Sequence, residues 1–411
     1  MKTVNWDLKI VSNTAAQLAA KFVGAGLTLV TTTLIIRLVG PALFGDLTKS
    51  LVLIAIGYTA IDFGLNAHAI RLLNQATSPR QVMSEIIGAR LLLSLIAVVL
   101  VNLLVYALPG GYTPALKSVF WLGSLAIIFQ GLYTSMNAWF QYQENYWASA
   151  WATIIGTLAG TTLTLYYVWT APTLFNFLLA NTLGYVVIAA PAILFGREVF
   201  GLTLNPARLR AILRGSLVLG AILLASVAAS KLDAVILGVF RPSSEVGEYG
   251  FAYRIFDVIL VLPVFIMNAV YPRLVKETIV KSSAIIRSSL MILGIFGVVI
   301  AIVSYLLSPL ILFIRPTLTL SVTSLRLLLL SLPLFFLTAP LMWHLISRRR
   351  EKPILVVYAL AALGNGALNL AFSPLFGAPA AAIITGITEL FIFIALFALN
   401  KSRYILHSRR E

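Results

Sequence analysis

Residues 45–75 read GDLTKSLVLIAIGYTAIDFGLNAHAIRLLNQ, which is an acidic start, a long apolar run and then a basic residue. Residues 247–277 read GEYGFAYRIFDVILVLPVFIMNAVYPRLVKE and repeat this order at an offset of 202 residues without a gap. Because the offset is close to half of the 411 residues, the match indicates two structural repeats. The identical positions in the first stretch are Gly45, Phe63, Asn66, Ala67, Arg71 and Leu72.

Each repeated stretch begins within a short break rich in glycine, proline and acid. The breaks read GPALFGDL at 40–47 and PSSEVGEY at 242–249. We interpret both as tight outer turns between the first and second helix of a repeat, with Pro41 and Gly45 closing one helix and starting the next. On this interpretation the breaks are structural and are not sites.

The composition requires a nonpolar surrounding as well as a nonpolar core. The chain is 60% hydrophobic and 11% charged, with a mean hydropathy of +0.97, whereas soluble domains have about 25% charged residues. A helix needs about 20 apolar residues to cross the hydrocarbon core, and continuous runs favour helices over a barrel. The sequence predicts an all-α polytopic membrane protein with about twelve spans, at 13–37, 44–70, 82–107, 117–140, 147–170, 173–195, 214–239, 248–272, 285–308, 325–346, 353–373 and 377–399.

The repeat divides these spans into two lobes of six helices. Since six is even, both lobes start on the same side of the membrane, and we expect parallel repeats related by a pseudo-two-fold axis along the membrane normal. The polar and basic segment 196–213 separates them. We therefore predict an N-lobe at 1–200 and a C-lobe at 201–411.

The net charge of +16 follows the positive-inside rule. With a cytoplasmic N-terminus, 20 of the 30 Lys and Arg residues fall at inner ends of the spans, six at outer ends and four at membrane depth. This distribution predicts a multi-pass protein of the plasma (inner) membrane with both termini in the cytoplasm. Because the charge is a topology signal, nucleic acid is not an expected partner.

Enzymatic constellations are missing from the sequence. There is no cysteine, and the histidines, His68, His344 and His407, are scattered, which argues against a metal site. The zinc-protease, phosphate-loop and nucleophile-elbow motifs are also absent from the sequence. We expect a transporter without catalytic residues, metal or cofactor.

The charges at membrane depth are the candidate site. Each costs roughly 2.5–3.5 kcal/mol at a helix centre and usually faces the bundle interior or water. Lys231 and Asp233 are two residues apart and point to different sides of a helix, whereas Arg254 and Asp257 are three apart and can pair. We predict that cations line a cavity suited to a phosphate-bearing substrate. These cations are Lys21, Arg90, Lys231 and Arg254.

Two alternatives attach to these charges. Arg90 lies near an end of its span, where its long side chain can also reach the interface by snorkelling. Three acids at depth, Asp62, Asp257 and Glu389, are candidate coupling groups for a proton or a sodium ion, although Asp62 equally suits a helix-packing role.

The run IIRLVGPALFGDLTKSLVLIAIGYTAIDFGLNAHAIR at 35–71 resembles the oligosaccharide flippases of polysaccharide biosynthesis, in the multidrug/oligosaccharidyl-lipid/polysaccharide (MOP) exporter superfamily. The segments KLDAVILGVF at 231–240, VGEYGFAYRIFD at 246–257 and AVYPRLVKE at 269–277 follow in the expected order. The resemblance implies a V-shaped pair of six-helix lobes that rock about a central cavity. It also implies a polyprenyl-diphosphate-linked oligosaccharide as cargo, the lipid bilayer and polysaccharide assembly proteins as partners, and Lys231 and Arg254 as cavity cations, with Lys21 and Arg90.

Other functions remain open at this point. The first is a proton- or sodium-coupled drug or metabolite antiporter of the same superfamily. A remote one is a membrane-embedded glycan polymerase or ligase, which would need a longer outer loop than the sequence offers. A peptidoglycan-precursor flippase is a near neighbour of the favoured function, but the chain has two helices fewer than that usual plan.

Overall fold

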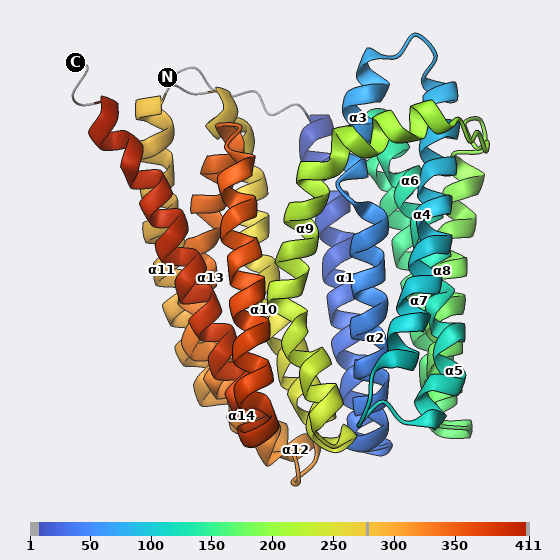
Figure 1. The fold of residues 1–411 in the computed structure, drawn as a ribbon, viewed down its shortest axis with the longest axis vertical. Coiled ribbons are helices and arrows are strands. Elements are labelled where there is room, and N and C mark those ends of the chain that lie inside the picture. Colours follow the sequence, from blue (N-terminus) through green and yellow to red (C-terminus); the bar gives the residue numbers. More distant parts are fainter. Residues whose placement is uncertain (1–7, 277–278, 408–411) are drawn as a thin grey trace. The chain divides into compact units, whose positions relative to one another are not determined.

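The computed structural model describes residues 8–276 and 279–407, and every regular element in these two ranges is helical (Figure 1). A segment in hydrocarbon satisfies its backbone hydrogen bonds internally, which is why long apolar runs become helices. The all-α architecture is confirmed. The helices of the first half are α1 (Leu8–Leu38), α2 (Pro41–Asp62), α3 (Leu65–Gln75), α4 (Pro79–Ala107), α5 (Pro114–Ser124), α6 (Ala126–Tyr142), α7 (Tyr146–Thr170) and α8 (Leu174–Phe195). Those of the second half are α9 (Pro206–Phe240), α10 (Ser243–Lys276), α11 (Ile279–Leu307), the 3-10 turn η1 (Ser308–Leu310), α12 (Ile311–Ile314), α13 (Thr319–Ser347) and α14 (Glu351–His407).

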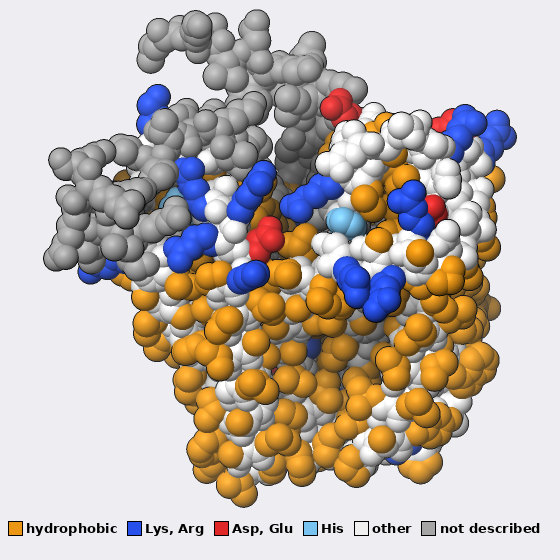
Figure 2. Space-filling view, turned by 45° about the horizontal axis from the view of Figure 1, so that its top comes forward, with side chains coloured by type: hydrophobic (Ala, Val, Ile, Leu, Met, Phe, Trp, Pro, Cys, Tyr) orange, Lys and Arg blue, Asp and Glu red, His pale blue; other side chains and the backbone are white. Residues whose placement is uncertain are grey.

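Within the described residues, eleven helical segments are long and apolar enough to cross a membrane. The last of them belongs to α14, in which Gly377 has φ 67° and ψ −147° and therefore interrupts the helix. The two parts of α14 correspond to the predicted spans 353–373 and 377–399. On the face drawn in Figure 2, apolar side chains cover the flanks, as a surface toward lipid requires. The termini predicted to be cytoplasmic, residues 1–7 and 408–411, lie outside the described residues.

The chain forms two compact units, and each has a hydrophobic core of its own. The first unit contains the residues up to Val39 and those from Ser50 to Gly220, and its core includes Ile86, Met136 and Phe140. The second unit contains Gly40–Lys49 and the residues from Ala221 onward, and its core includes Leu341, Ile354 and Ile392.

The division between the units falls inside α9, between Gly220 and Ala221, and not after residue 200, where the sequence analysis places it. The physical reason is that the first turns of α9 pack within the first unit. A β-carbon on Gly215 would lie 2.3 Å from the ring of His68, and one on Gly220 would lie 2.7 Å from the ring of Phe63. In Figure 1 the first turns of α9 run crosswise to the other helices of the unit. The basic segment is thus the start of a long helix.

The predicted span 44–70 is not one helix. The α2 helix ends at Asp62, and Phe63 and Gly64 both have positive φ, 38° and 67°, before α3 begins. Gly64 adopts this backbone conformation without steric cost. It also approaches a neighbour closely, since a β-carbon there would lie 2.6 Å from that of Leu219. The break therefore places Asp62 at the C-terminal end of α2.

The two repeated breaks lie against each other in the second unit. A β-carbon on Gly45 would lie 1.7 Å from the carbonyl oxygen of Ser243, and one on Gly247 would lie 2.0 Å from the carbonyl oxygen of Pro41. The interpretation of Gly45 as part of a turn is therefore wrong, because the turn is made by Gly40, with φ 107°, and Gly45 lies in the second turn of α2. Gly45 and Gly247 permit a close crossing of α2 and α10.

Candidate functional site

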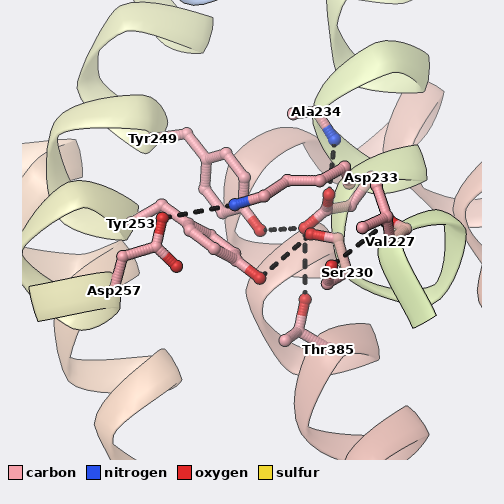
Figure 3. A network of polar contacts seen from close by, with 9 residues as sticks. Val227, Ser230, Asp233, Ala234, Tyr249, Tyr253, Asp257 and Thr385 are labelled. Carbon is pink, nitrogen blue, oxygen red and sulfur yellow. Dashed lines mark hydrogen bonds and ion pairs between the residues drawn. The ribbon is translucent and has the colours of Figure 1, made fainter. Parts of the chain in front are cut away.

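Lys231 of α9 forms an ion pair with Asp257 of α10 in the second unit, with its Nζ 3.2 Å from the Asp257 Oδ2 (Figure 3). The same ammonium group lies 4.3 Å from the ring centroid of Tyr253, close enough for a cation–π interaction. The side chains of Lys231 and Asp257 are 24% and 36% exposed. This partly accessible cation is the central feature of the candidate site.

The ion pair that the spacing of Arg254 and Asp257 allows is not formed. Asp257 pairs with Lys231 from the neighbouring helix, although Arg254 is at pairing distance along α10. Arg254 is half-buried and forms no ion pair with any residue that the structure describes. The guanidinium group of Arg254 is therefore free of a carboxylate partner among these residues, and Arg254 lies about one helical turn from Asp257 on α10.

Asp233 lies beside this pair but belongs to a different network. It is fully buried and accepts hydrogen bonds from the Tyr249 hydroxyl at 2.5 Å, the Thr385 hydroxyl at 3.2 Å and the Ala234 amide at 2.7 Å (Figure 3). These donors come from α9, α10 and α14, so Asp233 joins three helices. A carboxyl group satisfied in this way has a structural role.

Glu389 of α14 borders a cavity of about 220 Å³ inside the second unit. Its side chain is 6% exposed and forms no ion pair within the described ranges. Hydroxyl groups contribute much of the polar lining, and one lining residue is Tyr253, whose ring also contacts the Lys231 ammonium group. The hydroxyl-bearing residues around the cavity are Ser226, Ser230, Tyr253, Thr338, Tyr358, Thr385 and Thr388. An ionised carboxylate in such a place needs a cation nearby.

Arg90 lies in the first unit and does not snorkel. Its side chain is completely buried in α4, with Nη2 3.3 Å from the Asp62 Oδ1 and Nη1 3.3 Å from the Ser135 hydroxyl. Asp62, at the end of α2, is 33% exposed. The break after Asp62 thus brings a carboxylate to a buried guanidinium group, and Asp62 has the helix-packing role named as its alternative.

The four predicted cations fall into both units. Arg90 and Lys21 belong to the first unit, where the side chain of Lys21 is exposed on α1. Lys231 and Arg254 belong to the second unit and lie on adjacent helices. The structure brings Lys231 together with Asp257, and Arg90 with Asp62, while a shared cationic cavity stays a prediction.

Sequence reasoning missed Lys49, which it places at an outer helix end. Lys49 is fully buried, and its Nζ lies 2.7 Å from the Ser243 hydroxyl and 3.4 Å from Asp46. The hydroxyl of Ser243 donates to Asp46 at 2.6 Å. The signal in the sequence is the spacing of Asp46 and Lys49, three residues apart beside the repeated glycine, which fits a helical ion pair.

Similarity to known proteins agrees with this architecture. The family described as polysaccharide biosynthesis protein matches residues 10–278, whereas none of the curated proteins matches the chain in sequence. The fold is similar to that of the lipid II flippase MurJ in an inward closed conformation, with a TM-score of 0.81 and 14% identity over 92% of this chain and 86% of that one.

Two MATE transporters have a similar fold. An inward-facing multidrug resistance MATE family transporter of the MOP superfamily has a TM-score of 0.71 and 13% identity over 95% of this chain and 99% of its own. The Vibrio cholerae MATE transporter VcmN has a TM-score of 0.67 and 14% identity over 96% of both chains. Because the family match covers most of its length, the chain belongs to the polysaccharide biosynthesis protein family.

Proposed function

We propose that the protein is a flippase that moves a polyprenyl-diphosphate-linked oligosaccharide across the plasma (inner) membrane for cell-surface polysaccharide biosynthesis. The observation that carries the proposal is the partly exposed Lys231, held by Asp257 over the ring of Tyr253. A diphosphate is a stronger partner for an ammonium group than one carboxylate, because its charge is greater and its oxygens accept several charge-assisted hydrogen bonds. Arg254, which has no ion pair in the described part of the chain, adds a second cation on the adjacent helix.

The family supports the class of cargo. Members are described as polysaccharide biosynthesis proteins, and a structural neighbour is described as a lipid II flippase. A sugar headgroup does not cross about 30 Å of hydrocarbon unaided, so its passage needs a polar path through the protein while the lipid chain stays in the bilayer. Polysaccharide assembly proteins would supply and remove this cargo, with both termini of the flippase in the cytoplasm.

Transport would proceed by alternating access of the two lobes. The chain passes between the units at three places, after Val39, after Lys49 and after Gly220. Rocking of the units would concentrate backbone changes at these places, since a hinge absorbs motion in a few residues between packed bodies. The binding of a phosphate to Lys231 would release Asp257 and so link cargo to the packing of α9 on α10.

Translocation in vesicles tests this function. Reconstituted protein is given a fluorescent polyprenyl-diphosphate oligosaccharide, and its movement between leaflets is followed for the unaltered chain, Lys231→Ala, Arg254→Ala and Lys231→Arg. Lys117→Ala is a matched control, because its ammonium group donates to the Tyr106 carbonyl on an exposed surface of the first unit. We expect transport to fall at least tenfold in both alanine variants and to be retained in Lys231→Arg and Lys117→Ala. If the unaltered protein leaves the lipid in place, the flippase proposal is wrong.

An ion-coupled drug or metabolite antiporter is the second candidate, and the position of Glu389 favours it. Among the three proposed coupling acids, Asp62 and Asp257 are held by Arg90 and Lys231, and Glu389 borders a hydroxyl-lined cavity. Export of a cationic dye down a proton or sodium gradient, lost in Glu389→Gln, would support this function.

A further inference from the structure

A second hollow lies in the first unit, beside the first turns of α9. It has a volume of about 490 Å³, within the range of small-molecule sites, and its walls are almost entirely apolar. They come from the α2–α3 break, from α4 and from α9, through Phe63, Leu93, Leu213 and Leu217. We call this hollow the α9 groove.

Two arginines also line the α9 groove, Arg210 and Arg214. Arg210 and Arg214 are four residues apart on α9, so they lie one helical turn from each other. Leu213 and Leu217 have the same spacing. Arg210 and Arg214 are exposed, and neither forms an ion pair with a described residue. Arg208, by contrast, is engaged, with its Nε 3.8 Å from the Glu85 carboxylate.

The α9 groove therefore combines apolar walls with two guanidinium groups that have no ion pair with a described residue. This combination suits an anionic lipid, whose chain would contact the walls and whose headgroup would contact the arginines. A hydrocarbon chain that covers apolar walls otherwise facing water gains about 25 cal/mol for each square ångström removed from water. Guanidinium groups bind phosphate bidentately, and two of them one turn apart match the two phosphates of a diphosphate. A diacyl phospholipid offers one phosphodiester and two chains.

We propose that the α9 groove binds the carrier lipid itself, with part of the polyprenyl chain against Phe63, Leu213 and Leu217 and the diphosphate on Arg210 and Arg214. The proposal rests on the flippase function and adds an entry site for the cargo. The first turns of α9 run crosswise to the other helices of the unit (Figure 1). They carry Arg208, Arg210 and Arg214, which the positive-inside rule predicts to lie on the cytoplasmic side. The lipid would thus be captured there before the sugar headgroup reaches Lys231.

Photo-crosslinking tests the site. The full-length protein in lipid nanodiscs is irradiated with a polyprenyl diphosphate that carries a benzophenone in its chain, and the labelled peptides are identified by mass spectrometry. The variants are Leu213→Trp, which fills the groove, and Arg210→Gln with Arg214→Gln, which removes the charges. Their matched controls are Leu103→Trp, on an exposed position of α4, and Arg80→Gln with Arg197→Gln, which remove the same charge from other exposed positions of the unit.

We expect labelling of the peptides that contain Phe63 or residues 206–217, with a fall of at least fivefold in both groove variants and none in the controls. Unlabelled polyprenyl diphosphate should compete, and phosphatidylglycerol should not. Equal labelling of Leu213→Trp and Leu103→Trp, or equal competition by phosphatidylglycerol, would overturn the proposal. If Leu213→Trp labels weakly but transports the oligosaccharide at the full rate, the entry site is wrong and the flippase function stands. If the groove labels as expected in a chain that transports nothing, the flippase function is wrong and the groove is a lipid site of another kind.

Discussion

Arg90 and Asp62 form an ion pair whose partners are unequally buried, because the guanidinium group is inaccessible and the carboxyl group is one third exposed. Arg90 therefore depends on Asp62 much more than Asp62 depends on Arg90. A buried charge that loses its partner costs about 3–5 kcal/mol, whereas a partly exposed carboxylate can be solvated. The pair lies at the end of α2, since Asp62 is its last residue.

The unequal burial of Arg90 and Asp62 predicts which substitution lowers the stability of the protein more. Asp62→Ala should lower the melting temperature in detergent more than Arg90→Met does, because only the first leaves an unpaired buried cation. The double variant Asp62→Ala with Arg90→Met should be more stable than Asp62→Ala alone. Thermal unfolding followed by fluorescence measures all three. A double variant that is as unstable as the two losses combined would contradict the prediction, since independent sites show additive effects.

The glycine crossing predicts that a single methyl group is not tolerated at Gly45 or Gly247. Their added β-carbons would lie 1.7 and 2.0 Å from backbone oxygens, which cannot move as a flexible side chain does. Overpacking costs typically 1–3 kcal/mol, so Gly45→Ala and Gly247→Ala should melt at lower temperatures than the unaltered protein. Gly364→Ala is the control, because a β-carbon there meets no atom within 4 Å, and the change should stabilise α14 slightly. Equal melting temperatures for all three variants would refute the close crossing.

The break in α14 depends on Glu245. Its Oε1 accepts from the amide of Ala378 at 2.7 Å, directly after Gly377, and its Oε2 accepts from Arg241 at 2.8 Å. Glu245→Ala removes the acceptor for a helix-start amide and leaves Arg241 without its carboxylate, a loss of about 1–3 kcal/mol. Hydrogen exchange measured by mass spectrometry should speed up in the peptide around Ala378. Glu198→Ala, which removes an exposed contact to Gln143, should leave that peptide unchanged.

His68 predicts a pH dependence. It lies in α3, outside the membrane-spanning candidates, and burial, followed by the charge of Arg71, lowers its pKa below the ordinary value of 6.5. The folded state thus favours the neutral ring, so the unfolded chain binds the proton first as the pH falls, and stability decreases below about pH 6.5.

The test compares melting temperatures at pH 7.5 and pH 5.5. The unaltered protein should lose more stability over this interval than His68→Gln, which has no group to titrate at that position. If both proteins show the same decrease, other groups account for the acid sensitivity and the assignment to His68 fails.

The sequence predicted the spans because their signal is local. Long apolar runs are readable without a fold, and the short break between the spans 353–373 and 377–399 was visible as proline and glycine around Gly377. The break at Phe63–Gly64 was not, because a glycine within an apolar run is compatible with a helix. The positive φ of Gly64 occurs where the backbone lies close to Leu219, and Leu219 is distant in sequence.

The pairing of charges was the part that sequence spacing could not resolve. The spacing of Arg254 and Asp257 allowed an ion pair within α10, but the packing of α9 against α10 offered Lys231 to the same carboxylate. Similarly, the depth of Arg90 was underestimated because its partner comes from another helix. Which residues meet across helices depends on the rotation of each helix about its own axis, and hydropathy does not encode that rotation.

The crossing of α2 and α10 has one more consequence. Gly45 faces the carbonyl group four residues before Gly247, and Gly247 faces the carbonyl group four residues before Gly45. Such a self-complementary contact is isologous, the kind that two identical subunits make across a two-fold axis. The repeated sequence thus holds within one polypeptide a contact of the form found in a homodimer of six-helix chains. In a homodimer, one substitution would be present in both subunits and would change both halves of the contact. In this chain a substitution at Gly45 or at Gly247 changes only one half.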